Sequence, residues 1–66
     1  MITEPELRSI ETALAELADR VAAAGDALRD TSADSVAVDL YEAERHLRTA
    51  RRRITAAADS LTAGAP

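Results

Sequence analysis

Residues 30–35 read DTSADS, a run of short side chains that separates two stretches with helical periodicity. Short polar side chains hydrogen-bond to nearby backbone groups, so they favour turns and helix caps over helix interiors. Before this run, apolar residues recur at alternating steps of three and four, which is a heptad pattern: Leu7, Ile10, Leu14, Leu17, Val21, Ala24 and Leu28. After it, a second stripe follows the same rule: Val36, Leu40, Ala43, Leu47, Ala50, Ile54, Ala57 and Leu61.

The second stripe does not continue the register of the first, because whole heptads counted from Leu28 reach Ser35 and Glu42. The sequence therefore predicts two helices, near residues 4–29 and 33–63, joined by a turn at about residues 30–32. So short a turn makes the helices antiparallel neighbours. We expect an all-α, coiled-coil-like hairpin with a leucine and alanine seam, forming a single domain over residues 1–66.

The start of the first helix carries several signals. Thr3 is placed to cap it, and Glu6, three residues later, completes a capping box. Pro5 falls in the first turn, where its missing N–H has no consequence. Ile2 and Leu7 occupy the positions of a hydrophobic staple. Together these residues predict a helix that begins near residue 4.

The other helix ends are less uniform. Gly64 followed by Pro66 is typical of a helix C-terminus. Thr31 or Ser32 is expected to cap the second helix. Gly25 is expected to lie inside the first helix, because the stripe continues beyond it; an earlier end at this glycine is the alternative.

If the two stripes face each other, residues whose numbers sum to 64 lie opposite, such as Leu7 with Ala57 and Ala24 with Leu40. Large side chains then oppose small ones in four of the seven layers, as dense packing requires. Only eleven large aliphatic side chains serve the stripes of this chain of 66 residues. Ordering the backbone costs about 1–2 kcal/mol per residue, so an isolated hairpin should be marginal. We expect dimerisation into a four-helix bundle.

Two surfaces are candidates for contact with a partner or a second copy. A smooth strip at steps of three and four comprises Ala15, Ala18, Ala22 and Gly25; alternatively, alanine is there simply as a good helix former. Val38 and Tyr41, one turn apart, form an outward pair on the second helix. Tyrosine is enriched at interface hot spots, whereas the alternative is that Tyr41 lies over the edge of its own hairpin.

The net charge of −4 conceals an asymmetry, because residues 1–34 carry −5, residues 35–44 carry −3 and residues 45–66 carry +4. Three arginines are expected on the outward side of the second helix, as a basic face able to contact phosphates: Arg45, Arg48 and Arg52. The alternative is pairing, within or between chains, with the acids Glu6, Glu11, Glu16 and Asp19.

Residues able to do chemistry are few. The chain has no cysteine, and His46, its one histidine, is expected to be solvated; sharing a metal with Glu42 is a weak alternative. We therefore expect no catalytic residue, metal or cofactor. The longest apolar run is three residues and the N-terminus lacks a basic stretch, so we expect neither a membrane span nor a signal peptide. We expect a cytoplasmic location.

These patterns favour a small non-enzymatic module for protein–protein interaction. It would act as a dimerising helical adaptor, or as a regulatory subunit that lends helices to a larger partner. The competing hypothesis is a nucleic-acid-associated protein that uses the arginine-rich face of the second helix.

Overall fold

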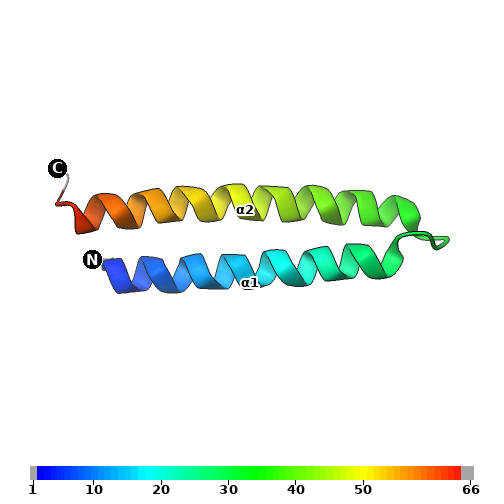
Figure 1. Cartoon of the computed structure of the whole chain (residues 1–66), viewed down its shortest axis with the longest axis horizontal. Coiled ribbons are helices and arrows are strands. Elements are labelled where there is room, and N and C mark those ends of the chain that lie inside the picture. Colours follow the sequence, from blue (N-terminus) through cyan, green and yellow to red (C-terminus); the bar gives the residue numbers. More distant parts are fainter. Residues whose placement is uncertain (1, 65–66) are drawn as a thin grey trace.

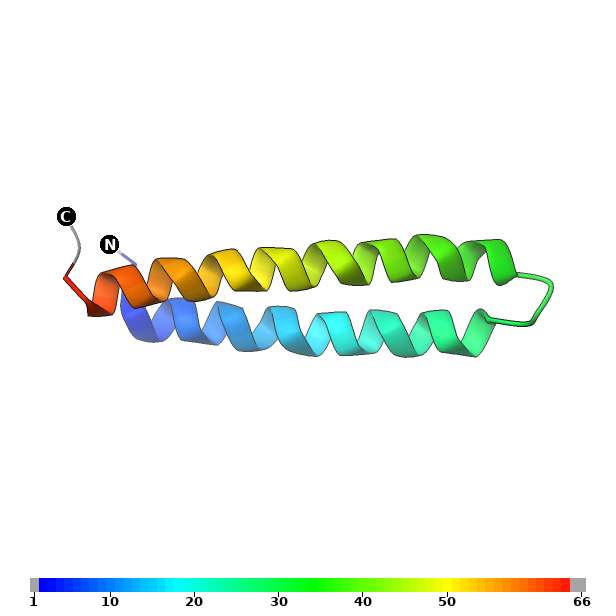
Figure 2. The same ribbon diagram turned by 45° about the horizontal axis from the view of Figure 1, so that its top comes forward.

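The computed structural model describes residues 2–64 and has two helices, α1 (Glu4–Leu28) and α2 (Asp34–Thr62). The helices run antiparallel and side by side, so the start of α1 and the end of α2 lie at the same end of the molecule (Figures 1 and 2). The hairpin is a rod with extents of 51 × 16 × 15 Å. This confirms the predicted all-α antiparallel hairpin, and both helices are one residue shorter at their C-terminal ends than expected.

The start of α1 at Glu4 and its threonine cap are as predicted. Thr3 is the N-cap, and its Oγ1 accepts a hydrogen bond of 3.3 Å from the backbone N–H of Glu6. Pro5 lies in the first turn, where no intrahelical partner is needed for its nitrogen. The helix passes through Gly25 and ends at Leu28, as the continued stripe predicted.

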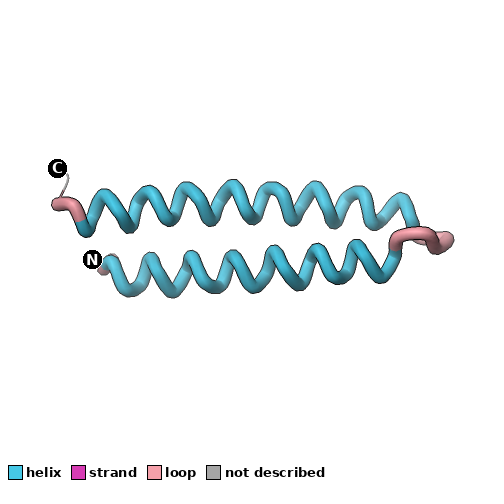
Figure 3. The backbone as a smooth tube through the Cα atoms, viewed as in Figure 1, coloured by secondary structure: helices cyan, strands magenta, loops and turns pink. Residues whose placement is uncertain are grey.

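The turn spans residues 29–33 and is longer than predicted (Figure 3). The predicted cap of α2 is wrong, because the N-cap is Ala33 and neither Thr31 nor Ser32 occupies that position. The Thr31 hydroxyl instead closes the turn, donating to the carbonyl of Leu28 at 2.5 Å and accepting from the N–H of Ala33 at 3.1 Å. Asp30 takes a positive φ of 64°, a conformation that aspartate tolerates better than most residues.

The end of α2 has the glycine that the sequence predicted. Gly64 has a φ of +69°, the left-handed conformation that glycine adopts without a steric cost, and its N–H donates to the carbonyl of Leu61 at 3.2 Å. Pro66, the second part of the predicted stop signal, lies outside the described residues.

The seam between the helices is built from different positions than expected. Among residues 2–64, the buried residues are Leu7, Ala18, Gly25, Ala37 and Ala58. Ile10 and Leu17, expected in the seam, are 40% and 43% exposed, and the alanines expected there are exposed as well: Ala24, Ala43, Ala50 and Ala57. Leu7 is buried as expected, but at Ala18, Gly25, Ala37 and Ala58 the residue after the expected one faces the neighbouring helix.

This rotation also corrects the predicted register. The pairs that bond across the helices have numbers that sum to 66 or 67, not 64: Arg8 with Asp59, Glu11 with Thr55, Asp19 with Arg48 and Asp26 with Tyr41. If each helix is rotated so that the next residue along the chain faces its neighbour, the sum of the residue numbers in a facing pair rises by two. The rotation has a physical reason, because the small seam residues allow close packing while long polar side chains reach across beside them.

Candidate interaction surface

One side of the hairpin, the polar flank, is defined by the side chains that bond from one helix to the other. These are Arg8, Glu11, Asp19 and Asp26 on α1, and Tyr41, Arg48, Thr55 and Asp59 on α2. Their contacts are distributed along most of the length of the rod. The polar side chains that define this flank are therefore paired within the chain.

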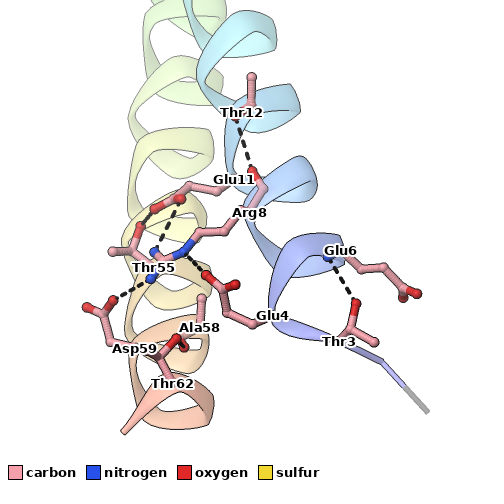
Figure 4. A network of polar contacts seen from close by, with 10 residues as sticks. All are labelled: Thr3, Glu4, Glu6, Arg8, Glu11, Thr12, Thr55, Ala58, Asp59 and Thr62. Atoms are coloured by element: carbon pink, nitrogen blue, oxygen red, sulfur yellow. Dashed lines mark hydrogen bonds and ion pairs between the residues drawn. The ribbon is translucent and has the colours of Figure 1, made fainter.

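Arg8 is the centre of the contacts near the open end (Figure 4). Its Nε lies 2.7 Å from Oε1 of Glu4, and its terminal nitrogens lie 3.5 Å from Glu11 and 2.8 Å from Asp59. Glu11 also accepts a hydrogen bond from the hydroxyl of Thr55 on α2. The hydrogen bonds from Arg8 to Asp59 and then to Glu4 raise its pKa, so this guanidinium stays charged at every accessible pH.

Arg48 makes the equivalent contacts near the middle of the rod. Its terminal nitrogen lies 3.0 Å from Asp19 on the other helix, and its Nε lies 2.9 Å from Glu44 on its own helix. The hydrogen bond to Asp19, followed by the one to Glu44, raises the pKa of Arg48. This pairing with Asp19 is the intramolecular alternative that the sequence left open for the arginines.

Tyr41 closes the polar flank near the turn. Its hydroxyl donates to Oδ1 of Asp26 at 2.5 Å, and this bond, followed by burial, raises the pKa of the phenol. The ring lies directly over Gly25, where an added Cβ would be 2.8 Å from Cε1 of the tyrosine. Tyr41 thus lies over its own hairpin, which was the alternative to an interface position, and Gly25 provides the space for its ring.

The opposite side of the hairpin can be located from two triplets of consecutive residues. In Leu17-Ala18-Asp19 on α1, the middle residue is buried in the seam and Asp19 bonds across the polar flank to α2. In Ala57-Ala58-Asp59 on α2, the middle residue is again buried and Asp59 bonds across the same flank to α1. Successive helical residues are about 100° apart, so the first residue of each triplet points to the other side.

This other side is the apolar face. Its exposed residues are Ile10, Leu17 and Ala24 on α1, and Val36, Ala43, Ala50, Ala57 and Leu61 on α2. Half-buried residues of the stripes form its floor: Leu14, Val21, Leu28, Leu40, Leu47 and Ile54. Val36 is 46% exposed and Leu61 is 48% exposed, so large aliphatic side chains lie open at both ends of the rod. Both apolar stripes of the sequence thus open on one side of the hairpin.

The residues predicted to receive a partner lie elsewhere. Ala18 and Gly25 are buried between the two helices and Ala15 and Ala22 are half-buried, so α2 itself occupies most of this strip. Val38 is 65% exposed, but it follows the seam residue Ala37 and therefore lies on the side of the polar flank. The two stripes are the sequence signal for the apolar face, although their heptad spacing by itself predicts an internal seam.

The predicted basic face is divided in the structure. Arg48 is drawn onto the polar flank, which corrects its expected outward position. Arg45 pairs with Glu42 on the preceding turn, and the terminal nitrogen of Arg52 donates to Oγ1 of Thr49 at 3.2 Å. Phosphate binding by these arginines stays a prediction.

Chemically reactive arrangements are sparse. His46 is exposed, with its Nε2 3.9 Å from the carboxylate of Glu42. Residues 2–64 contain no group of three or more His, Cys, Asp or Glu side chains placed to hold a metal ion. Over the same residues, neither helix combines the length and the apolarity needed to cross a bilayer.

Comparisons of the chain with protein-family models, with curated proteins and with solved structures gave no match.

Proposed function

We propose that the protein is a non-enzymatic interaction module that contributes its two helices to a larger helical bundle. The observation that carries this proposal is that both apolar stripes open on one side of the hairpin. Ile10 and Leu17 on α1 and Val36 and Leu61 on α2 are each at least 40% exposed. Contiguous exposed apolar surface bordered by polar residues is characteristic of interaction sites.

The geometry of the stripes supports a bundle of more than two helices. In a two-stranded coiled coil, the apolar stripe of each helix points directly at its one neighbour. In a four-helix bundle, the stripe points to the bundle axis, between two neighbours. Here Ala18 faces the neighbouring helix while Leu17 lies outside the seam, which matches the second arrangement.

The interior of the hairpin is too small to hold it folded alone. Among residues 2–64, the buried hydrophobic side chains are those of Leu7, Ala18, Ala37 and Ala58, and none is a large side chain with under 2% exposure. Full burial of a leucine is worth about 1.5–3 kcal/mol, whereas ordering one residue's backbone costs about 1–2 kcal/mol. Covering the apolar face supplies the missing burial, so folding and association are expected to be coupled.

Circular dichroism of the purified chain over a dilution series tests this coupling. Near 1 μM, a concentration at which weak complexes dissociate, the chain is expected to have much less helix than α1 and α2 contain, and to melt without a cooperative transition. A 7.0 kDa monomer with the full content of helix and a cooperative transition would contradict the proposal, because its face would need no cover. Sedimentation velocity on the same samples identifies the monomer.

A further inference from the structure

We infer that the apolar face is covered by a second copy of this chain, related by a twofold axis parallel to the long axis of the hairpin. The two turns then lie at the same end, and α1 of each copy faces α2 of the other. This inference rests on the proposed function and names the partner. It follows from the area of the face, from the sizes of its side chains and from the position of the charges.

The area of the face suits a stable dimer. The extents of the rod, 51 Å by 16 Å, give one whole side a projected outline on the order of 800 Å². Each partner in a standard protein–protein interface contributes about 800 Å². A second hairpin of the same length covers the whole face and brings two further apolar stripes to it.

The sizes of the side chains are complementary between copies. In the register set by Arg8 with Asp59, Ile10 lies level with Ala57, Leu17 with Ala50 and Ala24 with Ala43. A twofold axis along the rod keeps these levels and stacks α1 of one copy on α2 of the other. Ile10 and Leu17 of each copy then meet Ala57 and Ala50 of the second copy, so large side chains enter the space left by small ones.

The other twofold arrangement, with the turns at opposite ends, fits less well. Its axis is perpendicular to the rod and places α1 against α1 and α2 against α2. Ile10 then meets Ala24 of the second copy, but Leu17 meets Leu17, while the row of Ala43, Ala50 and Ala57 meets another row of alanines. The α1 pair would be held wide apart and the α2 pair close together, which two straight antiparallel hairpins satisfy less well.

The charges stay outside this dimer. The residues that make up the apolar face are uncharged, so its association buries no unpaired charge. Arg8, Asp19, Arg48 and Asp59 remain on the polar flank, paired within each copy and open to solvent. The dimer therefore keeps every polar contact that the hairpin already makes.

Sedimentation equilibrium tests the identity of the partner. Well above 1 μM, wild-type protein is expected at twice 7.0 kDa, with a Kd in the micromolar range. Leu17→Glu places a charge in the interface twice per dimer and is expected to raise the Kd at least about 100-fold. Ala23→Glu, on the exposed opposite side of α1, is the matched control and should keep the dimer mass.

Disulfide trapping tests the orientation, since the natural chain has no cysteine. The double variant Leu17→Cys/Ala50→Cys is expected to form a covalent dimer on mild oxidation, seen on a non-reducing gel. Leu17→Cys alone should stay mostly unlinked. If the single variant links as efficiently as the double variant, or the double variant links only within one chain, the proposed orientation is wrong.

The outcomes separate this inference from the proposed function. A chain that stays monomeric and largely unfolded even near 1 mM, far above typical dimer Kd values, would overturn the second copy but leave a different helical partner in place. A fully folded monomer would overturn both. A trimer or tetramer of hairpins, or equal loss of the dimer in Leu17→Glu and Ala23→Glu, would overturn the twofold pairing through this face.

Discussion

The polar flank and the apolar face belong to the same two helices, yet the side chains of the polar flank have partners within the hairpin and those of the apolar face remain open. On the polar flank, arginines, acids, a threonine and the tyrosine find partners across the hairpin. On the apolar face, Leu17, Val36 and Leu61 remain more than two-fifths exposed. A hydrogen bond or ion pair is complete with one partner, whereas an aliphatic side chain must be surrounded, and two helices cannot surround it.

This difference separates what fixes the hairpin from what stabilises it. Exposed ion pairs such as Arg48 with Asp19 set the rotation and register of the helices more than they add to stability. Burial of apolar area supplies most of the free energy of folding, and large aliphatic side chains such as Leu17 and Leu61 lie on the open face. The polar flank thus sets how the two helices are paired, whereas the apolar face supplies the stability once it is covered.

The largest expected effect comes from breaking the seam on which both sides depend. Ala18 is fully buried, so Ala18→Glu forces a charge between the helices and should abolish helical structure at all concentrations. Ala23→Glu, also on α1 but at an exposed position, should keep the helix content of the wild type at high concentration. Circular dichroism with urea titration measures both. Helical, cooperative Ala18→Glu protein would mean that the seam runs elsewhere.

The sequence predicted the hairpin because the DTSADS break and the two stripes are local signals. Apart from Leu7, the stripes lie to one side of the expected seam, because a heptad pattern gives the direction of the apolar centre and not the number of helices around it. The strip with Ala18 and Gly25 was recognised as a surface for close helix approach, but the helix that approaches is α2. Choosing between α2 and an outside helix requires the side-chain contacts of Arg8, Asp19 and Tyr41, which no spacing rule supplies.

A second, smaller effect on stability is expected from the contact between Gly25 and Tyr41. In a free helix, Gly25→Ala should stabilise by about 1 kcal/mol. Here the new Cβ would lie 2.8 Å from Cε1 and 3.1 Å from Cδ1 of Tyr41, so the ring must leave its position and its bond to Asp26. We expect little gain or a loss in the wild-type background, and the full gain in Tyr41→Ala protein.

Urea unfolding of the four proteins in this cycle, at one protein concentration, measures the coupling between the two sites. Equal stabilisation by Gly25→Ala in both backgrounds would show that the ring does not rest on the glycine in solution. Tyr41→Ala should also leave the dimer mass unchanged, because the tyrosine lies on the polar flank.

The Arg8 contacts should produce a still smaller effect that depends on salt. Arg8→Gln removes the ion pairs to Glu4, Glu11 and Asp59 and should lower the Tm by a few degrees at low ionic strength. The difference from wild type should shrink in 1 M NaCl, where the Debye length is about 3 Å. Leu17→Ala, on the apolar face, is the control whose loss of stability should persist in salt. A salt-independent effect of Arg8→Gln would point to packing by its aliphatic stem.

The smallest expected effect is the pH dependence contributed by Tyr41. Its hydrogen bond to Asp26, followed by burial, raises the pKa of the phenol above its ordinary value of 10.0. A raised pKa means that the folded state favours the protonated phenol, so this contribution to stability is fully present below pH 10 and is lost as the pH rises through the raised value. The free energy of unfolding should therefore decline in alkaline solution, because the phenolate would repel the Asp26 carboxylate.

Tyr41 is the chain's one tyrosine, and tryptophan, lysine and cysteine are absent, so absorbance at the phenolate band reports this group alone. The titration midpoint should be higher in folded protein than in urea, and Tyr41→Phe should be less stable at neutral pH but lack the alkaline decline. Equal midpoints in the two states would show that the bond to Asp26 does not persist in solution, and the polar flank would then end at Arg48.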